Sequence, residues 1–298
     1  MRCVSAAVEA YGGGAVAGSP NARVPAATEY FAQAMAFLTQ STIAHLHQWA
    51  AHPTSPTSAR RGEALAAYFE LVHRCLLFAP AALLMARDQS GSPEKEDQAR
   101  VRALSGGEVV AGQALQMAVA AFCDTDRDAA RAAIVFTTQL LGRCDGVLNP
   151  HAVQVQVVVL AAGPALAQAL VGALVSPPVS SSSSTTPAAP GATGGAHPQL
   201  RPHVATCLHR LVSAFTSNPE IHGVDRNTMI QHCHQWVEAS FSSSSVLCEK
   251  LDQDRRRQVL DRLFQLVSSQ IRFKSLALDV SKVCHGEMVP DDLLSHFM

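Results

Sequence analysis

The stretch "ALQMAVAAFCDTDRDAARAAIVFTTQLLGRC", residues 114–144, decides the fold class. In its second half, apolar residues recur at steps of three and four, the spacing that places side chains on one face of an α-helix. These residues are Ala133, Phe136, Leu140 and Cys144. The acidic turn "CDTD" precedes this helix and follows another apolar one. Two apolar helices joined by so short a turn predict a helical hairpin.

The same helical spacing recurs toward the carboxyl end. One set is Phe273, Leu276, Val280 and Val283, and a second is Leu260, Leu263, Phe264, Val267 and Ile271. Each set lays an apolar stripe along one helix face, and such a stripe has to be buried against a neighbour. We expect helices at 28–50, 61–78, 80–88, 108–123, 126–143, 151–162, 165–175, 199–216, 227–241, 245–252, 254–270 and 272–284.

Two local signals bear on these helices. Asp126 is expected to cap the helix that follows it, because its carboxylate can accept a hydrogen bond from an unpaired N–H of the first turn. The stretch "HAVQVQVVVL", residues 151–160, alternates like a strand and is rich in β-branched residues. Since the sequence offers no second strand to pair with it, we expect a helix there as well.

Changes in composition divide the chain. Residues 1–27 are rich in Ala and Gly and poor in acids, and we expect a disordered leader there, with a transit peptide as the alternative. The Ser/Thr/Pro/Gly-rich residues 176–198 cannot bury enough apolar area to offset their ordering entropy, which predicts a flexible linker or loop insertion. Helix pairs are expected at 28–175 and 199–298. The predicted fold is all-α, a HEAT-like solenoid of antiparallel helix pairs.

Composition also narrows the function classes. The 298 residues carry a formal net charge of −1, whereas a general nucleic-acid binder needs a clustered basic surface. The run Arg255-Arg256-Arg257 follows two aspartates and is interpreted as a solvated helix start, with a phosphate patch as the alternative. The longest apolar run is broken at Gly163-Pro164, short of the ~20 residues that cross a bilayer. Neither nucleic acid nor membrane is an expected partner.

The stretch "MIQHCHQWVEASF", residues 229–241, raises the question of a metal or catalytic site. On a helix, its apolar residues share one face: Met229, Cys233, Trp236 and Val237. His232 and His234 then project to opposite flanks, because residues two apart diverge by ~200°. Two histidines that share a metal on a helix need a spacing near four residues. We interpret the stretch as a packed helix, with a metal site or an enzyme using His232 or Cys233 as the alternatives.

No other pattern points to catalysis. The chain has no G-x-S-x-G nucleophile elbow, and Gly106-Gly107 precede a helix without phosphate-loop spacing or a lysine. We therefore predict no catalytic residue, no cofactor and no metal, and no enzymatic activity. The eight cysteines form no C-x-x-C pair, which favours a reduced compartment, the cytoplasm or the nucleus.

The segment 114–144 resembles a helix pair of the importin-β-type nuclear transport receptors, or karyopherins. The likeness is to the branch that contains importin thirteen and the transportins for SR-type splicing factors. In that branch an apolar helix ends near an acidic turn that contains a proline, and the next helix carries an aromatic residue, a Thr, a double apolar pair and a final Arg-Cys. The matching motif positions are Phe136, Thr137, Leu140, Leu141, Arg143 and Cys144.

The carboxyl end, "LFQLVSSQIRFKSLALDVSKVCHGEMVPDDLL", residues 263–294, looks like the last helices of the same family. Phe273 matches the basic-aromatic start of a helix that ends in Cys-Arg-Gly. Cys284 and Gly286 fit that ending, whereas His285 stands where Arg is expected. Trp236 lies where the family has an apolar helix with a tryptophan just upstream.

The resemblance covers about 28–298 and implies the carboxyl-terminal, cargo-side part of a nuclear import receptor. Such a receptor binds protein cargo on a concave face and phenylalanine-glycine nucleoporins outside, and it shuttles between nucleus and cytoplasm with enrichment at the nuclear envelope. The family's main Ran-binding repeats lie at the amino end, so Ran-GTP binding is expected only of a longer form. The alternative is a generic HEAT- or armadillo-like scaffold outside nuclear transport.

Overall fold

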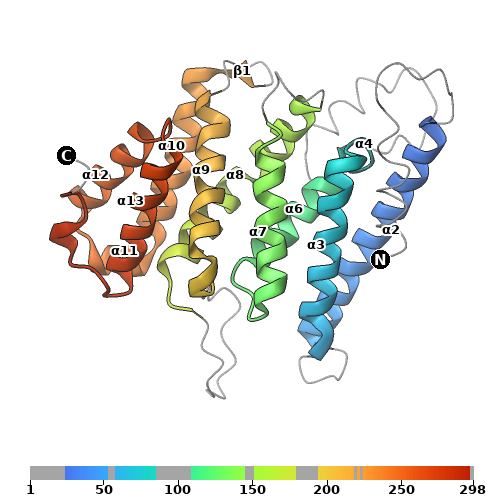
Figure 1. The fold of residues 1–298 in the computed structure, drawn as a ribbon, viewed down its shortest axis with the longest axis horizontal. Coiled ribbons are helices and arrows are strands. Elements are labelled where there is room, and N and C mark those ends of the chain that lie inside the picture. The colour runs from blue at the N-terminus through green and yellow to red at the C-terminus, as the bar shows by residue number, and fades with distance from the viewer. Residues whose placement is uncertain are drawn as a thin grey trace. The chain divides into compact units, whose positions relative to one another are not determined.

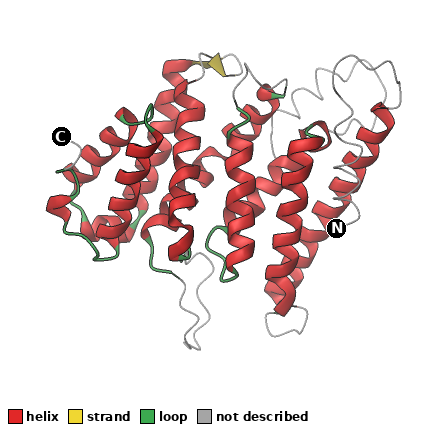
Figure 2. Cartoon of the chain, viewed as in Figure 1, coloured by secondary structure: helices red, strands yellow, loops and turns green. Residues whose placement is uncertain are grey.

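The computed structural model describes residues 24–52, 58–84, 109–144, 151–178, 194–217, 220–221 and 224–295, and nearly all of these residues are helical (Figures 1 and 2). The helices are α2 Val24–Ala51, α3 Arg61–Phe78, α4 Ala81–Leu84, α6 Val110–Ala121, α7 Arg127–Leu141, α8 Ala152–Val175, α9 Arg201–Ser217, α10 Arg226–Ser243, α11 Ser245–Lys250, α12 Gln253–Gln265 and α13 Gln270–Cys284. Short 3₁₀ turns lie at η2 Ser58–Arg60, η4 Pro198–Leu200 and η5 Pro290–Asp292. The all-α prediction is confirmed. A two-residue antiparallel hairpin, β1 Glu220–Ile221 with β2 Val224–Asp225, joins α9 to α10.

The chain divides into two compact units. Unit 1 comprises Met1–Ala118 and Arg131–Ala162, and unit 2 comprises Val119–Ala130 and Gly163–Met298. Helices α6, α7 and α8 each contribute residues to both units. The division between the two units therefore falls within helices.

The core of unit 1 forms around α2, α3 and α4, which pack on one another. Tyr68 and Phe69 of α3 are fully buried, and the Tyr68 hydroxyl shares a hydrogen bond of 3.0 Å with the hydroxyl of Thr39 on α2. Phe69 stacks on Phe136 of α7, with ring centroids 6.1 Å apart. Aromatic side chains from three helices thus fill the interior of this unit, where each removes a large apolar area from water.

Helix α13 packs against α9 at the centre of unit 2, and the two run antiparallel. Arg201, at the start of α9, pairs with Glu287, just past the end of α13, at 3.4 Å. Near the start of α13, the Phe273 ring meets the ring of His209, at the middle of α9, edge-on at a centroid distance of 5.1 Å. Helix α10 packs on α9, α11 and α12, so the unit is built from neighbouring helices with short connections.

Several local predictions are confirmed. The apolar stripe of α7 is buried from Ala133 to Cys144, and so is the stripe of α13 from Phe273 to Val283. Residues 152–160 are helical despite their strand-like alternation. Asp126 caps α7, because its Oδ1 accepts from the backbone N–H groups of residues 128 and 129 at 3.0 and 2.9 Å.

Other boundaries are wrong in instructive ways. Helix α2 begins at Val24, so the last four residues of the predicted leader are helical. Helix α12 ends at Gln265, because the N–H of Leu266 bonds back to the carbonyls of residues 262 and 263 and closes the last turn. Ile271 therefore leaves the predicted α12 stripe and lies on the outside of α13, 84% exposed. Residues 1–23, 85–88 and Gly106-Gly107, on which further predictions fall, lie outside the described part of the chain.

The predicted break at Gly163-Pro164 is also wrong, because α8 runs unbroken from Ala152 to Val175. Pro164 cannot donate a backbone hydrogen bond, and this costs helix stability. Residues on both sides of it, Val159 and Leu166, are fully buried, so packing holds the two halves in line. By length and apolar composition alone, this helix could cross a membrane. Within the protein, however, 56% of its most apolar 18-residue stretch is buried. That burial is typical of a core helix.

Candidate functional site

The histidine-rich stretch forms part of α10, whose first turn is capped by Asp225. Met229, Cys233 and Val237 are buried along one face, as predicted. Trp236 is half-buried and meets Phe215 of α9 edge-on at 5.2 Å. The helix therefore uses its apolar face for packing.

The two histidines of this stretch point apart. His232 stacks on Trp236, with centroids 6.5 Å apart. His234 faces α12, where its ring lies 4.9 Å from that of Phe264 and its Nε2 lies 3.7 Å from Asp261 Oδ1. Among the residues that the structure describes, no group of three or more His, Cys, Asp and Glu side chains is placed to hold a metal ion.

Burial makes most of the cysteines poor nucleophiles. It raises the pKa of the Cys233 thiol to about 12, and it does the same for Cys75, Cys144 and Cys284. A thiol with such a pKa is protonated at neutral pH, whereas the thiolate is the reactive form. Cys248 is exposed, and its Sγ lies 3.3 Å from the carbonyl of Ser242. No described histidine is recorded in contact with it.

The family-motif positions are packing and turn positions in both units. In unit 1, Phe136, Thr137, Leu140, Leu141 and Cys144 are buried, and Arg143 is half-buried. In unit 2, Phe273 and Cys284 are buried, Trp236 is half-buried, and Gly286 follows α13. Gly286 has φ = 74°, a conformation that other residues rarely adopt, and it lies at the end of the helix.

A polar junction at the end of α8 was missed by sequence reasoning. Pro177 and Pro178 have no N–H, so the carbonyls of Ala173 and Leu174 lose their usual partners four residues on. The hydroxyl of Ser281 on α13 donates to the Leu174 carbonyl at 2.6 Å. The N–H of Ala196 donates to the Ala173 carbonyl at 2.9 Å. Two prolines directly after a helix were the available signal, because they predict orphaned carbonyls without saying which residues satisfy them.

The same junction fixes both ends of the Ser-rich segment. The N–H of Gly195 donates to the Pro177 carbonyl at 2.7 Å. A Cβ at position 195 would lie 1.8 Å from the Ser176 carbonyl oxygen, so only glycine fits. His285 lies between two carbonyls, with Nδ1 2.6 Å from Ser281 O and Nε2 3.2 Å from Ser176 O. Residues 176–178 and 194–196 thus lie side by side, an arrangement that suits a loop insertion between α8 and α9.

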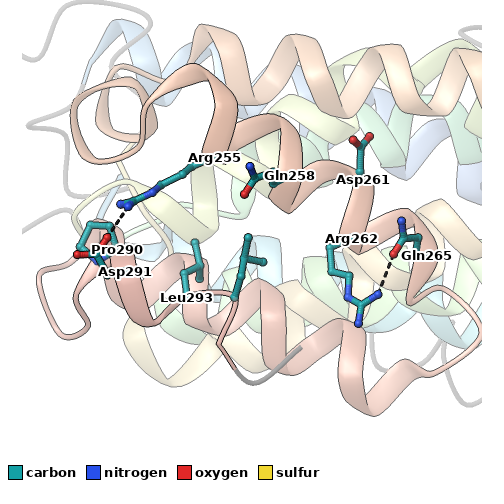
Figure 3. Close-up of a pocket in the computed structure, with 9 residues that line it drawn as sticks. Arg255, Gln258, Asp261, Arg262, Gln265, Pro290, Asp291 and Leu293 are labelled. Atoms are coloured by element: carbon teal, nitrogen blue, oxygen red, sulfur yellow. Dashed lines mark hydrogen bonds and ion pairs between the residues drawn. The ribbon is translucent and has the colours of Figure 1, made fainter. Parts of the chain in front are cut away.

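A groove on unit 2 is the candidate binding surface (Figure 3). It has a volume of about 570 Å³ and lies between α12 and the carboxyl-terminal segment. Its lining residues are Arg255, Gln258, Asp261, Arg262, Gln265, Pro290, Asp291, Leu293 and Leu294.

The charges of this groove are largely compensated. Arg255 pairs with Asp291 at one end, and Arg262 donates to Gln265 at 2.8 Å at the other (Figure 3). The groove is lined by two guanidinium groups, of Arg255 and Arg262, and by two carboxylates, of Asp261 and Asp291. The lining holds amide groups and leucines but no histidine, serine or cysteine. Such a surface can hydrogen-bond an extended peptide, and it offers no nucleophile or imidazole base.

Comparison of the chain with protein-family models, curated proteins and solved structures finds no match. The likeness to karyopherins therefore rests on the quoted stretches alone.

Proposed function

We propose that this chain works without catalysis, by binding other proteins, as the carboxyl-terminal, cargo-side part of an importin-β-type nuclear import receptor. The observation that carries the proposal is the role of the motif residues. Phe136 and Leu140 are fully buried in α7, and Phe273 is fully buried in α13. Packing positions are what a helical-repeat receptor requires, because each helix pair buries its stripe only against its neighbours.

A HEAT-like solenoid is part of this proposal. Its support is the pairing of successive helices, since α9 packs on α10 and α12 packs on α13 across short connections. A stack of such pairs can change curvature when one ligand binds, and this alters the fit of another. In the proposed receptor the ligands are protein cargo and phenylalanine-glycine nucleoporins. The groove on α12 offers a place for an extended protein segment.

The position of the tagged chain in living cells tests the transport role. We expect enrichment at the nuclear rim together with nuclear and cytoplasmic pools, because nucleoporin binding concentrates a receptor there. An even cytoplasmic distribution would favour the alternative, a HEAT- or armadillo-like scaffold outside nuclear transport. The Phe136→Ala variant serves as the control for loss of the fold.

Ran provides a second test. We expect no high-affinity binding of Ran-GTP by this chain alone, because the family's main Ran-binding repeats lie at the amino end of its members. A pull-down with Ran loaded with GTP or GDP measures this. Saturable binding that depends on the nucleotide would contradict the assignment to a carboxyl-terminal part.

A further inference from the structure

His209 lies at the middle of α9 with its ring inside unit 2, and it is only 6% exposed. Its Nε2 lies 2.9 Å from the carbonyl oxygen of Val267, which belongs to the turn 266–269 between α12 and α13. The ring also meets Phe273, near the start of α13, edge-on. A buried imidazole thus joins α9 to this turn and to the helix that follows it.

The hydrogen bond to Val267 fixes the state of the ring. A carbonyl oxygen only accepts, so Nε2 carries the proton, and in the neutral ring Nδ1 holds a lone pair. No described residue forms a hydrogen bond with this buried Nδ1. A second proton on the ring would therefore create a buried N–H without an acceptor, which is unfavourable. The surroundings suit the neutral imidazole.

The charged groups that act on the ring are both cations, Arg210 on α9 and Lys274 on α13. The turn 266–269 contains no charged residue, and the described parts of α10 and η4, which also pack on α9, add no charged group to these two. Burial lowers the pKa of His209 most, the hydrogen bond to Val267 opposes that shift, and the two cations add to it. Burial and charge together therefore disfavour the imidazolium.

We propose that His209 is a pH-sensitive switch: its neutral ring holds the turn 266–269 against α9, and its protonated ring releases that turn. Once the turn opens, the ring and the Val267 carbonyl both reach water, where the second N–H finds an acceptor. Protonation thus favours the open turn. The turn is closed at neutral pH and opens as the pH falls below about 6.5, where a histidine ordinarily gains its charge.

The turn adjoins the groove on α12. The N–H of Leu266 bonds to the carbonyl of Arg262, and both Arg262 and Gln265 line the groove. Opening of the turn therefore loosens the last residues of α12 and, with them, one end of the groove. The switch itself rests on the contacts of His209, and it depends neither on nuclear transport nor on a ligand in the groove.

Amide hydrogen exchange of the full chain, corrected for the intrinsic effect of pH on exchange, tests the switch. The N–H groups of Ser269 and Phe273 report on the turn, because each donates to a backbone carbonyl there at 2.9 Å. The N–H of Leu251, at the end of α11, is the internal reference. Relative to this reference, protection of the turn should fall up to about tenfold between about pH 7.5 and pH 5.5, because opening is coupled to the uptake of one proton.

Two variants separate the switch from a general response to acid. His209→Gln keeps a side-chain donor for the Val267 carbonyl but cannot titrate, so protection of its turn should not fall with pH. His73→Gln is the matched control, because it removes a histidine of unit 1 whose pKa is also lowered by burial. This control should keep the fall in protection at Ser269 and Phe273.

Three results would overturn the proposal: turn and reference amides that change alike in the wild-type chain, a fall that persists in His209→Gln, or a fall that is lost in His73→Gln. If His209→Gln does not fold, Lys274→Gln decides the question. It removes one of the two cations that act on the ring, so the fall should become smaller. A fall of undiminished size in a folded Lys274→Gln chain would contradict the switch.

Discussion

Helices α7 and α13 carry the two longest motif segments, yet they use their buried polar groups differently. In α7 the Thr137 hydroxyl donates within its own helix, to the Ala133 carbonyl at 2.9 Å. In α13 the Ser281 hydroxyl donates to the Leu174 carbonyl, 107 residues away in sequence. Helix α7 therefore holds its place by apolar packing, whereas α13 also closes the end of another helix. Two helices with similar apolar stripes can thus use the hydroxyl groups between those stripes for different physical tasks.

The largest expected effect is common to both helices. Phe136→Ala and Phe273→Ala each remove a fully buried ring, and each should lower the free energy of unfolding by about 3–5 kcal/mol. Urea titration of the two variants measures this. A loss below about 1 kcal/mol in either one would show that its stripe is not packed as described.

A polar pair of variants separates the two helices. Ser281→Ala should cost about 1–3 kcal/mol, because the Leu174 carbonyl is then left without a donor. Thr137→Val should cost less than about 1 kcal/mol, since it keeps the side-chain volume and the Ala133 carbonyl keeps its helical partner. Equal losses would contradict the contrast between a locally bonded helix and one that satisfies a distant carbonyl.

The contact of α10 with α8 tests packing by shape. A Cβ at Gly163 would lie 2.3–2.7 Å from three ring atoms of Trp236. Gly163→Ala should therefore cost about 1–3 kcal/mol through overpacking. Trp236→Leu should relieve this clash, so the double variant is expected to lose less than the sum of the two single ones. Simple additivity in urea titration would show that the ring does not rest on Gly163.

The junction at His285 offers a chemical test of the family comparison. The two ring nitrogens of His285 lie beside the carbonyls of Ser281 and Ser176. A neutral imidazole can donate to only one of these carbonyls, whereas the guanidinium of an arginine can donate to both. His285→Arg, the residue expected from the family, should keep stability within about 1 kcal/mol of the wild type, and His285→Leu should lose about 1–3 kcal/mol. Greater loss in the arginine variant would argue against a donor role at this position.

Acid should destabilise both units. Burial lowers the pKa of His73 in unit 1, with Arg74 and Arg143 adding to the shift. Burial also lowers the pKa of His209 in unit 2, against an opposing hydrogen bond to Val267. Because both pKa values are lower in the folded chain, the unfolded chain binds protons more readily. The contribution of these two histidines to the free energy of unfolding is therefore complete above about pH 6.5 and is lost as the pH falls below it. Urea midpoints between neutral and mildly acidic pH measure this, and a rising midpoint on acidification would contradict it.

The smallest effect is expected at the groove. Arg255→Ala breaks the pair with Asp291, but both side chains are partly exposed to solvent. Exposed ion pairs contribute about 0–1 kcal/mol, so stability should barely change. A loss as large as that of Ser281→Ala would mean that the carboxyl-terminal segment is held mainly by this pair.

Periodicity predicted what depends on local spacing. The stripes of α7 and α13 are buried as expected because each follows from residues three and four apart. The partner of Ser281 could not be predicted, since a hydroxyl has no sequence signal for a carbonyl more than one hundred residues away. The Gly163-Pro164 pair misled for a related reason. Its local preference for a break is overridden by the burial of its neighbours, and only tertiary structure reveals that burial.

The candidate site was less predictable than the fold. The histidines of α10 were correctly placed on opposite flanks, because helix geometry fixes their divergence. The groove on α12 was not foreseen. Arg255 was interpreted as part of a solvated helix start, and its pairing with Asp291 joins two segments 36 residues apart. Surface hollows between such segments depend on how a chain turns back on itself, which periodicity does not encode.

Direct binding to nucleoporin repeats tests the proposed role most sharply. The purified chain would be passed over immobilised phenylalanine-glycine repeats and, as the matched control, over the same repeats with each phenylalanine changed to serine. We predict retention on the phenylalanine repeats and none on the serine repeats. A chain that is folded by thermal melting and flows through both would contradict a role in nuclear transport.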